Sequence, residues 1–196
     1  GYTDKWVGAI PAKGVTSLNL PMEKRQNRIR RRTVRRSVPE NALYMAFHMG
    51  ARTDADYFPC DVISDILANG YSGRLKSRLV ERKRIFTKID AYIAGSEDPG
   101  LFRISGRVAP GISIEKAEEA VWHELELLKN KIVPMAEMRK VRNRFESEFT
   151  FRNLNRENLA GNIALFEWRG CAEELFNEVN NYRAVTAEQV RATARE

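Results

Sequence analysis

The segment A-L-Y-M-A-F-H-M, residues 42–49, restricts the possible folds more than any other part of the sequence. Its larger apolar side chains recur at every second position: Leu43, Met45, Phe47 and Met49. Because successive side chains of a β-strand point to opposite sides, this spacing predicts a half-buried strand. We therefore expect a sheet with one face on a hydrophobic core and the other face open.

Two later segments repeat this period and are joined by a short turn. Residues 88–94 place Ile89, Ala91 and Ile93 on one side, and residues 101–108 do the same with Phe102, Ile104 and Val108. The turn S-E-D-P-G between them indicates a β-hairpin. Residues 28–36 hold three β-branched side chains, so we predict another strand there. It would form a hairpin with residues 42–49, with a heavily charged outer strand.

The remaining segments have helical spacing. Helices are predicted from Asp54 to Asn69, over about 73–83, from Ser113, from Pro134, over about 156–169 and 171–182, and from Thr186. Ser113 is expected to cap its helix, and T-A-E-Q is a capping box. Hairpins followed by a run of helices predict an α+β fold of two layers, with a mostly antiparallel sheet covered by helices on one face.

The domain organisation follows from composition. Residues 1–27 have scattered glycine and proline and read as a linker or arm from a preceding region, and residues 28–196 form the domain. The chain starts without methionine and stops abruptly, so we expect a piece of a longer protein whose targeting segment lies elsewhere. No run of about 18 apolar residues is present, so no membrane-spanning helix is predicted. The compartment is left open.

The net charge of +7 comes from one stretch of the chain. Residues 24–36, K-R-Q-N-R-I-R-R-R-T-V-R-R, hold eight basic and no acidic residues, which leaves 25 basic against 26 acidic residues elsewhere. This basic run could bind nucleic acid or another anion, protect an exposed sheet edge from aggregation, or pair as a strand with an extended peptide. Because no aromatic residue is interleaved for base stacking, nucleic acid is the least favoured partner.

The sequence carries no hydrolytic centre of its own. Zinc hydrolysis needs clustered ligands, but His48 and His123 are the only histidines and no H-x-x-E-H motif is present. Cys60 and Cys171 lack a neighbouring base, so we expect both to be packing residues and not catalytic nucleophiles. The segment N-G-Y-S-G-R-L lacks the spacing of a phosphate loop and is read as a tight turn between helices.

Three stretches together resemble the second, non-zinc-binding domain of the pitrilysin/insulinase-type zinc metallopeptidases, similar to mitochondrial processing peptidase-like domains. These are A-L-Y-M-A-F-H-M-G followed by D-A-D-Y-F-P-C-D-V-I-S-D-I-L-A-N-G-Y-S-G-R-L, then G-L-F-R-I-S-G-R-V, and the tail V-T-A-E-Q-V-R-A-T-A-R. The resemblance spans about residues 28–196. It implies a sheet covered by helices on one side.

The resemblance also implies a division of labour. A homologous half, on the same chain or a separate subunit, would carry the zinc and the inverted motif, while this chain binds no cofactor and is inactive alone. The two halves would close on an extended peptide substrate. An inactive structural relative in a larger assembly, and an anion- or nucleic-acid-binding module using the basic run, are the alternatives.

The residues that would serve these roles can be named by alignment. In catalytic relatives an arginine and a tyrosine of the following segment assist the transition state; those positions fall on Val80 and Thr87 here, although a shift to Arg78 or Arg82 would restore an arginine. The stretch is therefore read as scaffold. The expected peptide-facing contacts are Arg30, Arg32, Arg35 and Arg74.

Overall fold

The computed structural model describes residues 1–196 except 12–13, 15–20, 22–25 and 96. It divides into two compact units, Gly1–Ser37 and Val38–Glu196. The first unit contains the short helix α1 (Tyr2–Val7), which the weak periodicity of the arm did not predict. The contacts within the chain divide it after Ser37. The domain boundary expected near residue 28 stays a prediction.

The second unit is built on an antiparallel sheet of three strands. These are β1 (Ala42–Met49), β2 (Phe86–Ala94) and β3 (Gly100–Val108), in the order β1-β3-β2. In the register, Phe47 lies opposite Phe102, which lies opposite Ile93. The hairpin of β2 and β3 and the alternating burial of β1 confirm the period-two prediction.

The strand predicted at residues 28–36 is wrong. The described residues 26–38 form neither helix nor strand, and Ile29 and Val34 are both at least 60% exposed. Too many positions in this run are cations for it to present an apolar face, so burial cannot pin it to a sheet. Within the described residues β1 pairs only with β3, and the hairpin expected between 28–36 and 42–49 does not form.

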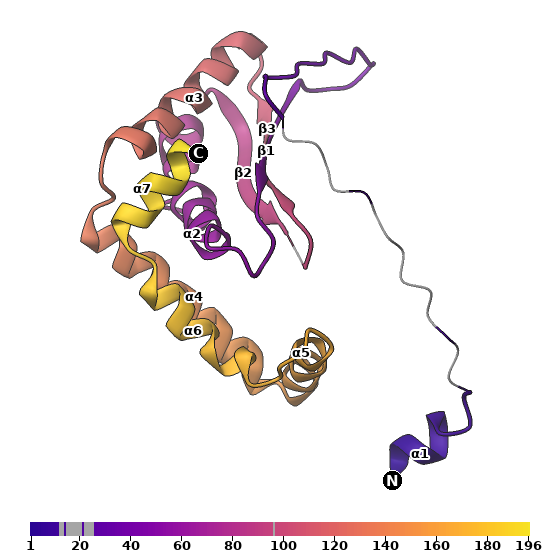
Figure 1. Ribbon diagram of the computed structural model, residues 1–196. Coiled ribbons are helices and arrows are strands. Elements are labelled where there is room, and N and C mark those ends of the chain that lie inside the picture. Colours follow the sequence, from indigo (N-terminus) through magenta and orange to yellow (C-terminus); the bar gives the residue numbers. More distant parts are fainter. Residues whose placement is uncertain (12–13, 15–20, 22–25, 96) are drawn as a thin grey trace. The chain divides into compact units, whose positions relative to one another are not determined.

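Helices cover one face of the sheet (Figure 1). They are α2 (Tyr57–Ala68), α3 (Ile114–Asn130), α4 (Met135–Leu154), α5 (Arg156–Trp168), α6 (Glu174–Ala184) and α7 (Ala187–Arg195). α2 packs on β2, and α7 packs against both α2 and α3. Side chains with no exposed surface, among them Val62, Ile66, Val121, Leu128 and Val190, form the core between these helices and the sheet. The α+β prediction is confirmed.

The predicted caps of two helices are present. Ser113 Oγ accepts the Lys116 N–H at 3.2 Å, and Thr186 and Gln189 bond reciprocally as a capping box. α2 begins later than expected, at Tyr57, because the Asp54 carboxylate accepts the N–H of Ala51 in the preceding turn.

The segment Lys76–Arg82 is a π-helix (η1) where an α-helix was predicted. Its wider turn is seen in the bond from the Lys83 N–H to the Arg78 carbonyl, five residues back. Leu75 and Leu79 are fully buried and anchor the segment to the core. Arg84 then adopts a φ of +50°, and β2 starts two residues later.

The last part of the chain forms a helical layer beside α2. α4 and α6 lie side by side, and α5 packs against both at one end of the pair (Figure 1). α2 contacts α4 and α6. α2 is therefore covered by the sheet on one side and by this helical layer on another.

Candidate functional site

Two adjoining hollows lie along α2, and they share Asp61, Asp65 and Asn69 in their walls. The first, of about 450 Å³, runs between α2 and residues 90–93 of β2, and we call it the α2–β2 groove. The second, of about 340 Å³, is enclosed by α2, α4, α5 and α6, and we call it the helical pocket. The two hollows therefore border each other along these three residues.

One wall of the groove is an edge strand. In the sheet order β1-β3-β2, β2 pairs with β3 on one side, and within the described residues no strand pairs with its other side. A strand edge carries a row of backbone donors and acceptors that can pair with another chain. The groove therefore offers hydrogen-bonding backbone along one wall and polar side chains of α2 along the other.

The sequence of α2 divides the helix into two faces. In C-D-V-I-S-D-I-L-A, the side chains of Val62, Ile66 and Leu67 have no exposed surface. Asp61, Ser64 and Asp65 stand at i, i+3 and i+4, and this spacing places them together on the other face. The helix can therefore anchor in the core while presenting two carboxylates to the hollows.

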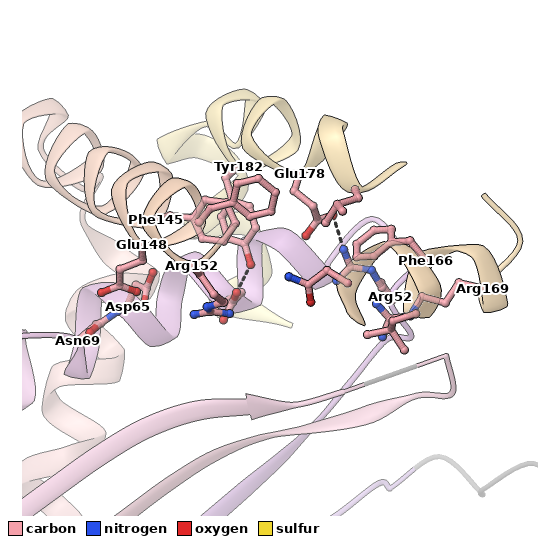
Figure 2. Close-up of a pocket in the computed structure, with 15 residues that line it drawn as sticks. Arg52, Asp65, Asn69, Phe145, Glu148, Arg152, Phe166, Arg169, Glu178 and Tyr182 are labelled. Carbon is pink, nitrogen blue, oxygen red and sulfur yellow. Dashed lines mark hydrogen bonds and ion pairs between the residues drawn. The ribbon is translucent and has the colours of Figure 1, made fainter. Parts of the chain in front are cut away.

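Asp61 is held by a buried hydrogen-bond network. The Tyr182 hydroxyl of α6 donates to one carboxylate oxygen, and the Ser64 hydroxyl lies 3.3 Å from the other. Phe145 of α4 stacks on the Tyr182 ring, with ring centroids 3.5 Å apart (Figure 2). Burial raises the pKa of the Asp61 carboxyl and, together with the Asp61 charge, the pKa of the Tyr182 hydroxyl.

Asp65 is the second carboxylate of this face. The Asn69 side-chain amide donates to it at 2.6 Å. Burial, followed by repulsion from Asp61, raises the pKa of Asp65 from 3.8 to about 6. This carboxyl thus changes its charge close to neutral pH.

The far end of the helical pocket is closed by a cation among aromatic rings. The guanidinium of Arg52 forms an ion pair with Glu178 of α6 (Figure 2). Its Cζ also lies 5.1, 5.7 and 5.2 Å from the ring centroids of Tyr57, Phe58 and Phe166. Burial raises the pKa of Glu178 in spite of this partner. The cluster ties the start of α2 to α5 and α6.

The predicted contact Arg74 lies outside these hollows. It is 8% exposed, and its Nε and Nη2 donate to the two carboxylate oxygens of Glu137 at 2.9 and 2.6 Å. This bidentate pair joins the start of the π-helical segment to α4. The other predicted contacts, Arg30, Arg32 and Arg35, are exposed in the first unit; Lys24 and Arg25 of the basic run lie outside the described residues. The peptide-facing role of all four arginines stays a prediction.

The two positions aligned with the arginine and tyrosine of catalytic relatives carry neither a guanidinium nor a phenol group. Val80 is half-buried against the core, and Thr87 is exposed where β2 is irregular between Phe86 and Lys88. Arg78, which a shifted alignment would use, donates to the buried Glu124 at 2.5 Å.

No zinc site is assembled among the described residues. His48 lies on β1 and His123 on α3, both exposed, and no three metal-ligating side chains are grouped in the part of the chain that the structure describes. Cys60 is buried, and burial raises the pKa of its thiol to about 12, whereas Cys171 is exposed.

Sequence reasoning missed Asp61, Asp65, Arg52, Glu178 and Tyr182. The one signal available was two aspartates four residues apart in an otherwise apolar helix. Glu178 and Tyr182 reach this region through contacts with Arg52 and Asp61, 126 and 121 positions away, whereas Arg52 lies just before α2 and donates to the Tyr57 hydroxyl.

A comparison with protein families assigns the chain to a family. The family model of the peptidase M16 inactive domain matches residues 2–145. The chain belongs to this family. M16 peptidases are the pitrilysin/insulinase-type zinc proteases that the sequence resembles, and this domain corresponds to their non-catalytic half.

Solved structures share the fold of the M16 inactive domain. A protease from Helicobacter pylori superposes with a TM-score of 0.73 at 20% identity, over 79% of this chain and 37% of that chain. The inactive peptidase domain of a Bordetella parapertussis protein gives 0.70 at 23% identity, over 81% and 85%. The peptidase M16 inactive domain from Pseudomonas fluorescens gives 0.65 at 19% identity, over 78% and 36%.

These coverages set the scale of the domain. The chain spans just over a third of the Helicobacter pylori and Pseudomonas fluorescens chains and most of the Bordetella parapertussis chain. No curated protein matches it. In the described part of the chain, no helix is long and apolar enough to cross a membrane.

Proposed function

We propose that this domain holds an extended peptide as an added strand on the edge of β2, while a homologous half supplies the zinc. The observation that carries the proposal is the free edge of β2 beside the α2–β2 groove, as seen among the described residues. Strand addition beside a helix is a recurring mode of peptide recognition, in which the backbone gives affinity and pockets for alternate side chains give specificity.

The walls of the groove favour particular peptide side chains. An added strand would lie about 4.8 Å from β2, with alternate side chains pointing toward α2. There they would meet Asp61 and Asp65, whose carboxylates favour cationic or hydrogen-bond-donating groups. For the first unit, considered by itself, we keep the proposal that Arg30, Arg32 and Arg35 contact acidic side chains of a peptide.

The domain would contribute to hydrolysis without performing it. Zinc in the homologous half would lower the pKa of a bound water and polarise the peptide carbonyl. This chain's residues would fix the substrate backbone in an extended form, which turns an encounter with the zinc-bound water into an intramolecular step. Arg74, expected from the sequence to face the peptide, is proposed instead to act as a positioning residue, because its pair with Glu137 joins the segment leading into β2 to α4.

The proposal can be tested with labelled peptides. Fluorescence anisotropy would measure the affinity of the chain for an unstructured peptide and for two forms of it that are N-methylated at alternate residues, one form for each alternating set. Only one set of N–H groups points toward β2 in an added strand, so we expect one of the modified peptides to bind at least tenfold more weakly than the unmodified peptide. Equal affinities of all three peptides would refute strand addition.

A pair of variants locates the binding site. Ala68→Leu adds three heavy atoms to the wall of the groove, whereas Ala136→Leu makes the same change at an exposed position of α4. The first should weaken peptide binding severalfold and the second should leave it unchanged. If the wild-type chain binds no peptide but forms a stable complex with a zinc-bearing half, the domain is a structural subunit instead.

A further inference from the structure

The two edges of the sheet differ in their protection against pairing with a second copy. Native proteins guard an exposed edge with charged side chains, proline or a bulge. β2 has two of these features. Lys88 and Asp90 form an ion pair at 3.1 Å, and the pairing of β2 with β3 is irregular between Phe86 and Lys88. β2 is therefore an edge with built-in protection against self-association.

The edge strand β1 has none of these protections. A-L-Y-M-A-F-H-M contains no lysine, arginine, aspartate, glutamate, proline or glycine, and its register with β3 runs without interruption from Ala42 to Met49. Within the described residues no strand pairs with its other side. A long, regular and apolar edge of this kind readily pairs with another strand. β1 therefore has the composition of a strand that is paired on both sides.

The side chains beside this edge are only partly covered. Leu43, Met45 and Phe47 lie on the core side of the sheet, yet all three are only half-buried, whereas Ile104 of the central strand is buried. Trp122 of α3, whose ring lies 5.6 Å from that of Phe47, is half-buried as well. A strand added to β1 would complete the cover over these apolar groups.

We propose that β1 pairs antiparallel with β1 of a second copy of this chain, which joins two three-stranded sheets into one. An uncharged edge can meet an identical edge without like-charge repulsion. With the twofold axis at Ala46, two small side chains meet at the axis, and Met45 lies opposite Phe47 of the second copy as a sulfur–aromatic pair. The inference does not depend on the function proposed above, because the edge of β2 stays available to a peptide.

The helix behind β1 favours the same symmetry. α3 packs on β1, and the Trp122 indole donates to Glu118 at 3.1 Å, while Lys129 Nζ lies 5.9 Å from the Trp122 ring. This stripe of α3 thus has an anion toward its start and a cation toward its end. A twofold axis normal to the sheet makes the two copies of α3 antiparallel, so unlike charges face each other across the interface.

The size of the edge is sufficient for a specific dimer. The eight residues of β1 span about 27 Å, and a strand layer with a helix layer behind it is about 20 Å high. Two such edges together bury on the order of 1,100 Å², which exceeds the 1,000 Å² or so expected of a specific interface.

The first test is the oligomeric state of this chain, measured by light scattering over a dilution series. Cys171→Ser is the background for all samples, because Cys171 is exposed and could form disulfide-linked pairs. We expect a dimer. Ala46→Lys places two charges at the axis and should raise the dissociation constant at least tenfold. Ala136→Lys, the same change at an exposed position of α4, should leave it unchanged, and circular dichroism confirms that both variants fold.

A cross-link tests the register. Residues directly opposite each other in an antiparallel pair have Cα atoms about 4.5 or 5.5 Å apart, a separation that a disulfide can span. Under mild oxidation, Ala46→Cys should therefore form an intermolecular disulfide at least tenfold faster than Ala136→Cys.

Four results would overturn the proposal: a chain that is monomeric throughout the dilution series, an unchanged dissociation constant for Ala46→Lys, an equal loss in the Ala136→Lys control, and equal cross-linking at the two positions. If the chain is monomeric and Ala46→Lys abolishes peptide binding in the anisotropy assay, the strand that pairs with β1 is the peptide and not a second copy. A dimer that binds no peptide would support this proposal and refute only the function proposed above.

Discussion

Replacing the ionisable carboxyl of Asp65 with an amide should stabilise the protein at pH 7.5 but not at pH 4. In the folded chain its pKa is about 6, against 3.8 in the absence of burial. The folded state therefore binds the proton more tightly, so the wild type loses stability as the pH rises from about 4 to about 6. A shift of this size corresponds to about 3 kcal/mol. Asp65→Asn should be more stable than wild type by up to that amount at pH 7.5 and about equally stable at pH 4.

The assay is urea unfolding followed by circular dichroism at pH 4, 5, 6 and 7.5. In the Asp65→Asn variant the Asn69 amide can still donate to the carbonyl oxygen of the introduced side chain, so only the charge is lost. Asp98→Asn, at an exposed loop position, is the control for the change from carboxylate to amide itself. A stability difference that is the same at pH 4 and pH 7.5, or a variant less stable than wild type at pH 7.5, would refute the argument from burial.

Three further predictions concern packing, thiols and charge. Gly106→Ala would place a methyl group 2.6 Å from the Phe86 ring, so the free energy of unfolding should fall by about 1–3 kcal/mol. Adding Phe86→Leu to this variant should restore part of the loss, whereas strictly additive effects of the two substitutions would contradict a clash. A thiol-reactive disulfide reagent should modify Cys171 in the native protein and Cys60 only after denaturation, and two native reactive thiols would oppose the assigned burial. Replacing the three exposed arginines Arg30, Arg32 and Arg35 with alanine should weaken the binding of an acidic peptide and reduce the salt dependence of that binding. Anisotropy titrations that these substitutions leave unchanged would show that the arginines do not contact the peptide.

The parts of the fold that the sequence predicts are those with a local cause. The capping box at Thr186, the cap at Ser113 and the alternation in residues 42–49 depend on neighbours in the chain, and all three are present. The strand at 28–36 failed because β-branched residues alone do not make a strand. Without an apolar face, nothing fixes Ile29 and Val34 to a sheet.

The candidate site was beyond local reasoning. The bond between Tyr182 and Asp61 and the ion pair between Arg52 and Glu178 join segments 121 and 126 positions apart. Such pairs follow from how the helical layer packs on α2, and one sequence carries no record of that packing. The predicted contact Arg74 illustrates the converse, since its partner Glu137 is 63 positions away and nothing near either residue in the sequence indicates the pairing.

The π-helix at Lys76–Arg82 has a consequence for how this chain is compared with its relatives. A π-helical turn accommodates about one residue more than an α-helical turn. Beyond this segment, a residue matched to a relative by counting along the sequence is therefore not the residue that occupies the same place in space. The assignment of the helper positions to Val80 and Thr87 counts through this segment. Equivalence with an active M16 half should therefore be established by superposing β2 and working backwards from it. A gain or loss of one residue here can be absorbed by the width of a helical turn, with Leu75 and Phe86 kept in the core on either side.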